Sequence, residues 1–235
     1  AALRVHVCEW SSSAALMHAP FSGFPLDSAP VREGALELAL YATSSERRAQ
    51  LHAALARALA ALAADGGEGT PLCVIACGFG GVVVQDVIAA LQHATTAGGG
   101  ERERDSGEAP RRHSDGDDDG GASDEGSLDL SSLDLSPLER GETLAFLGTL
   151  GCPSPLLPKL EDEADSGSGV PAVPAPYILR RWPRLRGGWT NLFHRADPLA
   201  CPLQDSRRMA AARVTDVATS ARPQKGQPVQ WCYMN

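Results

Sequence analysis

Several features that define common protein classes are missing from the sequence. No run of 18 or more apolar residues occurs among its 235 residues, which argues against a membrane-spanning helix. No CxxC pair is present, and no cysteine has a histidine at zinc-ligand spacing, so we expect neither a metal site nor a cofactor. The N-terminal residues carry no secretory signal, and the chain begins with Ala1 instead of Met, which is compatible with processing.

The six cysteines are distributed along the whole chain instead of forming close pairs. Several of them lie in apolar runs, where a thiol behaves as a small hydrophobic group. We interpret them as buried free thiols, which predicts an intracellular protein in a reducing compartment, either the cytoplasm or the interior of an organelle. The residues concerned are Cys8, Cys73, Cys77, Cys152, Cys201 and Cys232.

The acidity of the chain is concentrated in one segment. The formal net charge is −8, and residues 101–140 alone hold 13 acidic and 5 basic residues, whereas residues 177–235 carry a net charge of +7. The stretch at 97–135 combines low hydrophobicity with high charge, so it cannot bury enough apolar area to offset the entropy of ordering. We therefore predict a disordered acidic insertion there, and net charge alone identifies no partner.

The remaining residues are sufficient for one folded domain. The apolar content of 43% is typical of a globular protein, and fewer than about 200 residues outside the insertion can bury one sizeable core. We expect residues 1–96 and 136–235 to form the two parts of a single α/β domain around the insertion at 97–135. A second acidic stretch at 161–176 is rich in Gly, Ser and Pro and is expected to be flexible.

The spacing of apolar residues predicts the main elements. Residues 44–66 are expected to form a helix, because a serine can cap its start and leucines recur every three or four positions. The run at 72–76 is typical of a buried parallel strand, and a glycine-rich turn separates it from a second helical run at 82–91. Further strands are predicted at 3–10, 143–150, 189–193 and 213–217, whereas 11–35 is expected to be a loop and 36–42 is compatible with strand or helix.

The segment at residues 72–84, LCVIACGFGGVVV, places small residues around Gly78. Small residues allow a turning strand and the departing helix to approach closely. The segment resembles the nucleophile elbow of the α/β-hydrolase superfamily, especially its lipase and serine-esterase branch, in which the nucleophile lies on a strained strand-to-helix turn. The resemblance implies an α/β fold with a mostly parallel sheet and helices on both faces. It assigns the elbow to Ala76, Cys77, Gly78, Phe79, Gly80 and Gly81.

Two later segments are similar to the same family and occur in the same order. Residues 146–153, FLGTLGCP, look like the strand and LGTP/LGSP turn that follow the elbow. Residues 189–203, WTNLFHRADPLACPL, are similar to the W-x-N segment of related hydrolases, which ends in D-P-V-A and P-L. In that segment the Asp before Pro is the acid of the catalytic triad, and Asp197 matches it.

The catalytic side chains themselves are missing. Gly78 occupies the nucleophile position, so no hydroxyl is present to form an acyl-enzyme. No histidine follows Asp197, and Gln230 or Trp231 occupies the position at which the family carries one. An oxyanion H-G loop is also missing after the first predicted strand. We therefore expect a catalytically inactive homologue that acts as a binding, regulatory or structural subunit of a larger assembly.

Other functions remain open at this point. An active lipase-like or esterase-like hydrolase would need a non-standard nucleophile, either Cys77 or a serine of the 11–13 loop. Nucleotide binding is disfavoured, because the glycine spacing is not GxGxxG and no Gly-Lys-Ser/Thr follows. Arginines interleaved with Trp182 and Trp189 suggest nucleic acid, but the acidic insertion supplies a counter-charge, so protein partners are favoured. His194 is interpreted as a surface histidine.

Overall fold

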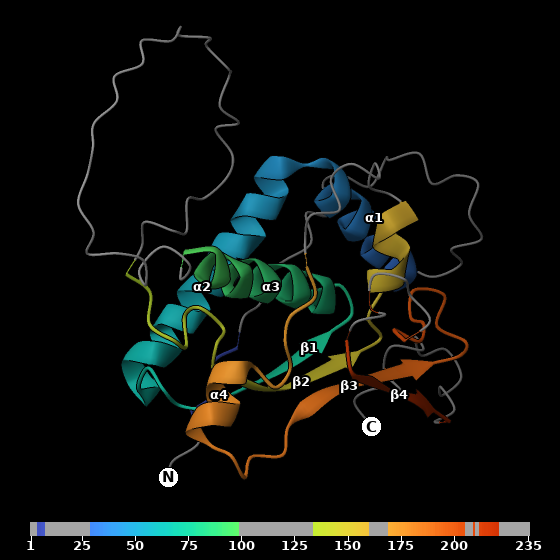
Figure 1. Ribbon diagram of the computed structural model, residues 1–235. Coiled ribbons are helices and arrows are strands. Elements are labelled where there is room, and N and C mark those ends of the chain that lie inside the picture. Colours follow the sequence, from blue (N-terminus) through green and yellow to red (C-terminus); the bar gives the residue numbers. More distant parts are fainter. Residues whose placement is uncertain are drawn as a thin grey trace, which may run out of the picture.

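The fold is seen in a computed structural model, which describes residues 4–7, 29–98, 134–159, 169–204, 209 and 212–220 (Figure 1). Four strands form one sheet in the order β1-β2-β3-β4, and every neighbouring pair is parallel. The α/β class and the parallel sheet are therefore confirmed. The strands are β1 (Leu72–Cys77), β2 (Leu144–Leu150), β3 (Gly188–His194) and β4 (Val214–Thr219).

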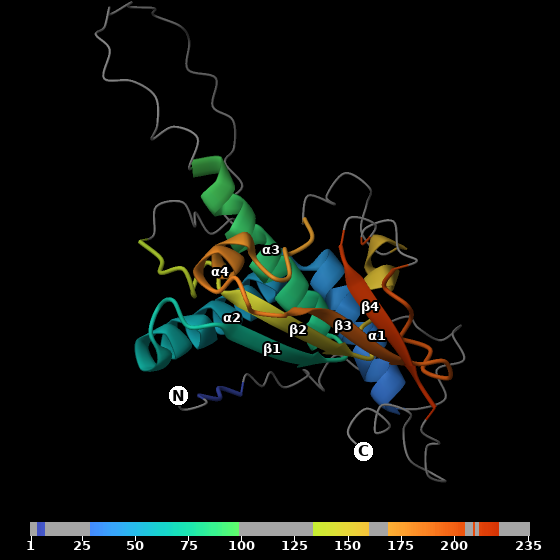
Figure 2. The ribbon, with the colours of Figure 1, turned by 60° about the horizontal axis from the view of Figure 1, so that its bottom comes forward.

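Helices connect and cover these strands. Helices α1, α2 and α3 lie on the same side of the sheet, and α4 lies at the end where the strands begin (Figures 1 and 2). Within the described residues, the expectation of helices on both faces is met for one face only. None of the described helices is long and apolar enough to cross a membrane. The helices are α1 (Ala29–Thr43), α2 (Ser45–Gly66), α3 (Gly80–Gly98), the 3-10 helix η3 (Ser154–Lys159) and α4 (Pro176–Arg181).

Helix α2 follows directly from its sequence. The side chain of Ser44 caps it by accepting a hydrogen bond from the backbone amide of Arg47 at 3.2 Å. Leu51, Leu55 and Leu59 are buried because their spacing places them on one face. The helix ends at Gly66, as the sequence predicts.

Two expectations for the N-terminal region are wrong. Residues 4–7 form no strand, and Val5 and Val7 are exposed, so their alternation has neither a pairing strand nor a packing surface in the described structure. The predicted loop at 11–35 ends earlier than expected, because α1 already begins at Ala29. The ambiguous run at 36–42 is helical, since Leu38 and Tyr41 are three residues apart and share the buried face of α1.

The two faces of the sheet differ in exposure. On β1, Leu72 and Ala76 point toward the helices and are buried, whereas the alternate residue Ile75 is 69% exposed. Cys73 and Cys77 share the exposed side with Ile75. The prediction of buried thiols is therefore wrong for these two residues, because strand alternation places them opposite the helices. Cys152 is buried, Cys201 is half-buried, and no disulfide joins the described cysteines; Cys8 and Cys232 lie outside the described residues.

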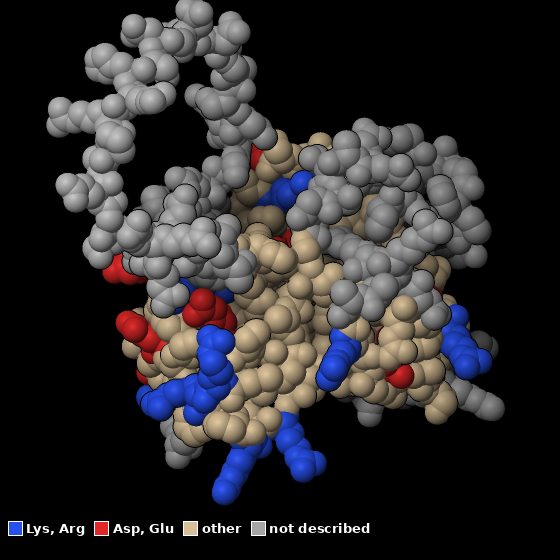
Figure 3. Space-filling view, viewed as in Figure 1, with Lys and Arg blue, Asp and Glu red and all other residues tan. Residues whose placement is uncertain are grey.

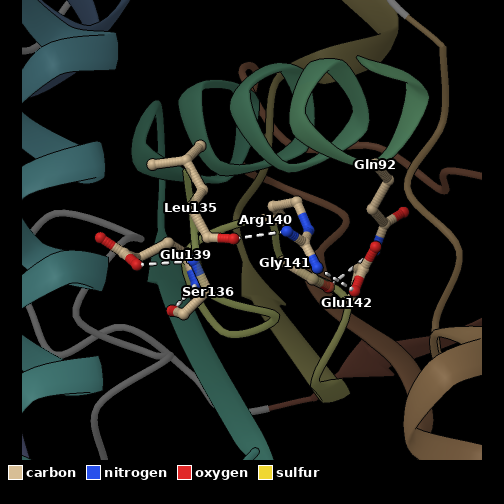
Figure 4. Close-up of polar contacts among 7 residues, drawn as sticks. All are labelled: Gln92, Leu135, Ser136, Glu139, Arg140, Gly141 and Glu142. Carbon is tan, nitrogen blue, oxygen red and sulfur yellow. Dashed lines mark hydrogen bonds and ion pairs between the residues drawn. The ribbon is translucent and has the colours of Figure 1, made fainter. Parts of the chain in front are cut away.

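The chain is described up to the end of α3 at Gly98 and again from Asp134, so residues 99–133 of the predicted acidic insertion lie outside the described part. Figure 4 shows how the returning segment is held. The backbone amide of Ser136 donates to Glu139 Oε2 at 2.9 Å, and the amide of Glu139 donates to Ser136 Oγ at 3.4 Å, as in a capping box. Arg140 donates to the carbonyl of Leu135 and pairs with Glu142. These local bonds fix the entry into β2.

Gln92 on α3 ties two segments to the helix. Its Nε2 donates to the carbonyl of Gly141 at 2.9 Å and to that of Ala172 at 3.3 Å, and its Oε1 accepts from the amide of Ala172 at 2.7 Å. Residues 169–176 of the stretch expected to be flexible thus lie against the folded domain, and Ala175 is fully buried. Residues 160–168 lie outside the described part.

Candidate functional site

The elbow-like segment forms a sharp turn between β1 and α3. Gly78 has φ +55°, a left-handed conformation that glycine adopts at little cost, and its amide donates to the carbonyl of Leu150 at 2.7 Å. The amide of Gly81 donates to the carbonyl of Gly78 at 3.1 Å, which closes the turn. A Cβ added at Gly78 would meet nothing within 4 Å. A side chain at this position would therefore project into open space from a constrained backbone.

The other elbow residues are packed much more tightly. A Cβ on Gly81 would lie 2.7 Å from Cys152 Sγ and 3.2 Å from Cys152 Cβ, so only glycine fits without displacement. Ala76 is buried beneath the turn, and the ring of Phe79 packs edge-on against Tyr41 with centroids 5.3 Å apart. Gly80 is the first residue of α3. Two of the small residues singled out in the sequence are thus required, Gly81 by packing and Gly78 by the backbone conformation.

Asp197 lies in the turn that follows β3 and is only 4% exposed. Its Oδ1 accepts a hydrogen bond from the amide of Leu199 at 3.0 Å, and its own amide donates to the carbonyl of His194 at 2.9 Å. His194 Nδ1 in turn accepts from the amide of Ala196 at 3.1 Å. Gly78 comes after the end of β1, and Asp197 comes after the end of β3. Because the strands are parallel, both residues lie at the carboxyl edge of the sheet. In open α/β sheets this edge is where ligands bind.

A row of polar side chains crosses the helix-facing side of the sheet near this edge. Thr149, Asn191 and Asp216 are register partners on β2, β3 and β4. Thr149 Oγ1 donates to Asn191 Oδ1 at 3.0 Å and accepts from Trp189 Nε1 at 3.1 Å. Asn191 Nδ2 donates to Asp216 Oδ1 at 2.7 Å. We call Thr149, Trp189, Asn191 and Asp216 the polar row.

The polar row holds the loop that carries Asp197. Asp216 accepts hydrogen bonds from the backbone amides of Leu203 at 3.0 Å and Gln204 at 2.9 Å, and Asn191 donates to the carbonyl of Cys201 at 3.2 Å. Sequence reasoning missed Thr149 and Asp216 as structural residues. The two-residue spacing of Trp189 and Asn191 was the one available signal, since it places both on the same side of β3.

Neither thiol near the turn is poised as a nucleophile. Cys77 is the last residue of β1 and shares the open side of the sheet with Ile75, away from the helices. Partial burial raises the pKa of its thiol, which disfavours the thiolate. Complete burial raises the pKa of Cys152 to about 12, and its sulfur accepts a hydrogen bond from Gln85 at 3.2 Å. The hydroxyl of Ser154 donates to Gln85 Oε1 at 2.8 Å, so this buried serine has a structural role as well.

A second buried polar cluster lies between α1, α2 and α3, behind the turn. The hydroxyl of Tyr41 donates to Asp86 Oδ2 at 2.8 Å and lies 2.7 Å from His52 Nε2. Since this hydroxyl proton is directed to Asp86, the hydroxyl oxygen accepts a hydrogen bond from the Nε2–H of His52. Burial and the nearby Arg48 lower the pKa of His52, against the opposing effect of Asp86, so the neutral ring is favoured. No pattern in the sequence predicted this cluster.

The structure brings together only part of the predicted site. Gly78 and Asp197 follow the same edge of the sheet, but Gln230, Trp231 and the serines of the 11–13 loop lie outside the described residues. Across the described ranges, no group of three or more His, Cys, Asp or Glu side chains could hold a metal ion.

Comparisons with protein-family models, with curated proteins and with solved structures each gave no match for this chain.

Proposed function

We propose that the chain is a catalytically inactive α/β-hydrolase homologue that acts as a binding, regulatory or structural subunit of a larger assembly. The observation that carries this proposal is the turn at Gly78. The strand-turn-helix at Gly78, with φ +55° at the carboxyl edge of a parallel sheet, is the backbone geometry that a nucleophile elbow requires, and this supports the assignment. Gly78 has no side chain, which supports the absence of catalysis.

The order of the strands supports the same proposal. The turn at Gly78 follows β1, and the buried Asp197 follows β3, two positions away in the sheet. The segment FLGTLGCP, which is similar to the hydrolase segment after the elbow, begins on β2 between them. Asp197 Oδ1 accepts a hydrogen bond from the amide of Leu199, which supports a turn-capping role for this carboxylate.

The open side of the sheet supports a binding role. Parallel sheets are normally covered on both faces, whereas here Ile75 is largely exposed and Cys73, Cys77 and Val217 are exposed on the side opposite the helices. An exposed apolar face of this kind is typical of a surface that another element covers.

Activity-based labelling tests the proposal. We expect the full chain to show no labelling by a fluorophosphonate and no ester turnover above background, with a known serine esterase as the positive control. Turnover that is lost in Cys77→Ser, or in Asp197→Ala, would overturn the proposal and establish an active hydrolase with a non-standard nucleophile.

A gain-of-function variant tests the scaffold separately from the activity. Gly78→Ser combined with Trp231→His restores the two missing side chains at the positions that the resemblance assigns. We expect fluorophosphonate labelling to appear in this double variant and to be reduced when Asp197→Ala is added. Labelling that is insensitive to Asp197 would contradict the assignment of the elbow and acid positions.

A further inference from the structure

A cationic and apolar surface lies at the opposite end of the sheet from Gly78. Helix α4 and the turn that follows it lead into β3, so they lie at the edge where the strands begin, as Figure 1 shows. From Leu179 to Arg186, every large side chain except that of the half-buried Leu185 is exposed. We call this the Arg–Trp surface, and its members are Leu179, Arg180, Arg181, Trp182, Arg184 and Arg186.

The charge of this surface is of one sign. Residues 169–194 contain four arginines and no aspartate or glutamate. None of these arginines forms an ion pair or side-chain hydrogen bond with another residue that the structure describes, and the guanidinium of Arg181 lies 6.0 Å from the ring centroid of Trp182. Among the residues that the structure describes, Glu68 lines an open hollow of about 400 Å³ together with Arg181 and Trp182. Figure 3 shows basic side chains projecting from the surface over α4.

Two large apolar side chains are exposed among these charges. Trp182 is 47% exposed and Leu179 is 40% exposed. The backbone that presents them is fixed, because Ile178 and Ala175 are fully buried and the amide of Trp182 donates to the carbonyl of Ile178 at 2.8 Å. Trp182 and Leu179 are therefore exposed on an ordered backbone. Exposing apolar side chains to water is unfavourable, so a partner that covers them would gain binding free energy.

The combination of side chains decides between two anionic partners. Arginine and tryptophan suit nucleic acid and an anionic bilayer equally well. Both partners present phosphates to the arginines, and tryptophan either stacks on bases or lies at a lipid interface. Leu179 discriminates, because an aliphatic side chain gains from entering the boundary of the acyl chains and gains little from a phosphate backbone or a base. We propose that the Arg–Trp surface docks the protein peripherally on an anionic lipid bilayer, with Trp182 and Leu179 inserted and the arginines on the headgroups.

Vesicle co-sedimentation of the full chain tests this proposal. We expect binding to vesicles of phosphatidylcholine with 30% phosphatidylserine, little binding to pure phosphatidylcholine, and release at high salt. Because each basic residue near an anionic surface contributes about 1 kcal/mol, Arg181→Glu with Arg184→Glu should weaken binding by at least about tenfold. The matched control is Arg57→Glu with Arg213→Glu, which reverses two exposed arginines elsewhere and should bind like the parent chain.

A second variant separates insertion from charge. Trp182→Ser keeps all four arginines and should still weaken binding several-fold, and quenching of tryptophan fluorescence by brominated lipid should decrease with it. Three outcomes would overturn the proposal: no binding to the anionic vesicles, equal loss in the control pair, or binding of single-stranded nucleic acid in place of vesicles by the same surface.

Discussion

The two sides of the four-stranded sheet are built from the same strands but hold different side chains. Toward the helices, Thr149, Asn191 and Asp216 form a hydrogen-bonded row that secures the loop after β3. On the other side, Ile75 and the neighbouring thiols are apolar and exposed. The helix-facing side therefore holds a structural network that secures the loop carrying Asp197, whereas the open side offers only apolar surface.

The largest effect is expected at the end of the polar row that lies on β4. Asp216→Ala removes the acceptor for Asn191 and for the amides of Leu203 and Gln204, so the free energy of unfolding should fall by about 3 kcal/mol. Chemical denaturation measures this loss. Asp216→Asn is the matched control, because its single amide oxygen can still accept, and it should lose less. Equal losses in the two variants would mean that the carboxylate does not organise the loop.

The two glycines of the elbow-like segment provide a sharper comparison at the junction of β1 and α3. Gly81→Ala places a methyl group against Cys152 Sγ and should destabilise by about 2 kcal/mol through overpacking. Gly78→Ala meets no neighbouring atom and should lose only about 1 kcal/mol, the cost of its positive φ. Thermal unfolding of the two variants checks the order. A larger loss at Gly78 would contradict the open space described around the turn.

The sequence was most informative where a local pattern determined the structure. The serine cap and leucine spacing predicted α2, and the strands predicted at 72–76, 143–150, 189–193 and 213–217 match all four described strands. The polar row was not predictable, because Thr149, Asn191 and Asp216 are far apart in sequence and become neighbours only through the strand register. The exposure of Cys73 was missed for a related reason: an apolar run indicates a strand but not whether both of its faces are covered.

The buried cluster behind the elbow predicts a pH dependence of stability. The pKa of His52 is lowered in the folded protein from its ordinary value of 6.5, so the unfolded chain binds more protons as the pH falls below that value. The contribution of His52 is therefore present above about pH 6.5 and is lost as the pH falls through the folded pKa. Denaturation at pH 7.5 and pH 5.5 should show this loss. His52→Gln can still donate to Tyr41 but does not titrate, so a matching loss in this variant would assign the effect to other groups.

The smallest effect is expected on the open side of the sheet. Ile75→Thr keeps a β-branched side chain in β1, and because Ile75 is already 69% exposed, stability should change by no more than about 0.5 kcal/mol. Val74→Thr on the same strand is the control from the helix-facing side, where a hydroxyl would replace packed apolar surface, and it should be clearly destabilising. Chemical denaturation of the full chain compares the two. If Ile75→Thr lowers the free energy of unfolding as much as Val74→Thr does, the open face must be covered in the whole protein. The two sides of the sheet would then differ in what packs against them and not in their exposure to solvent.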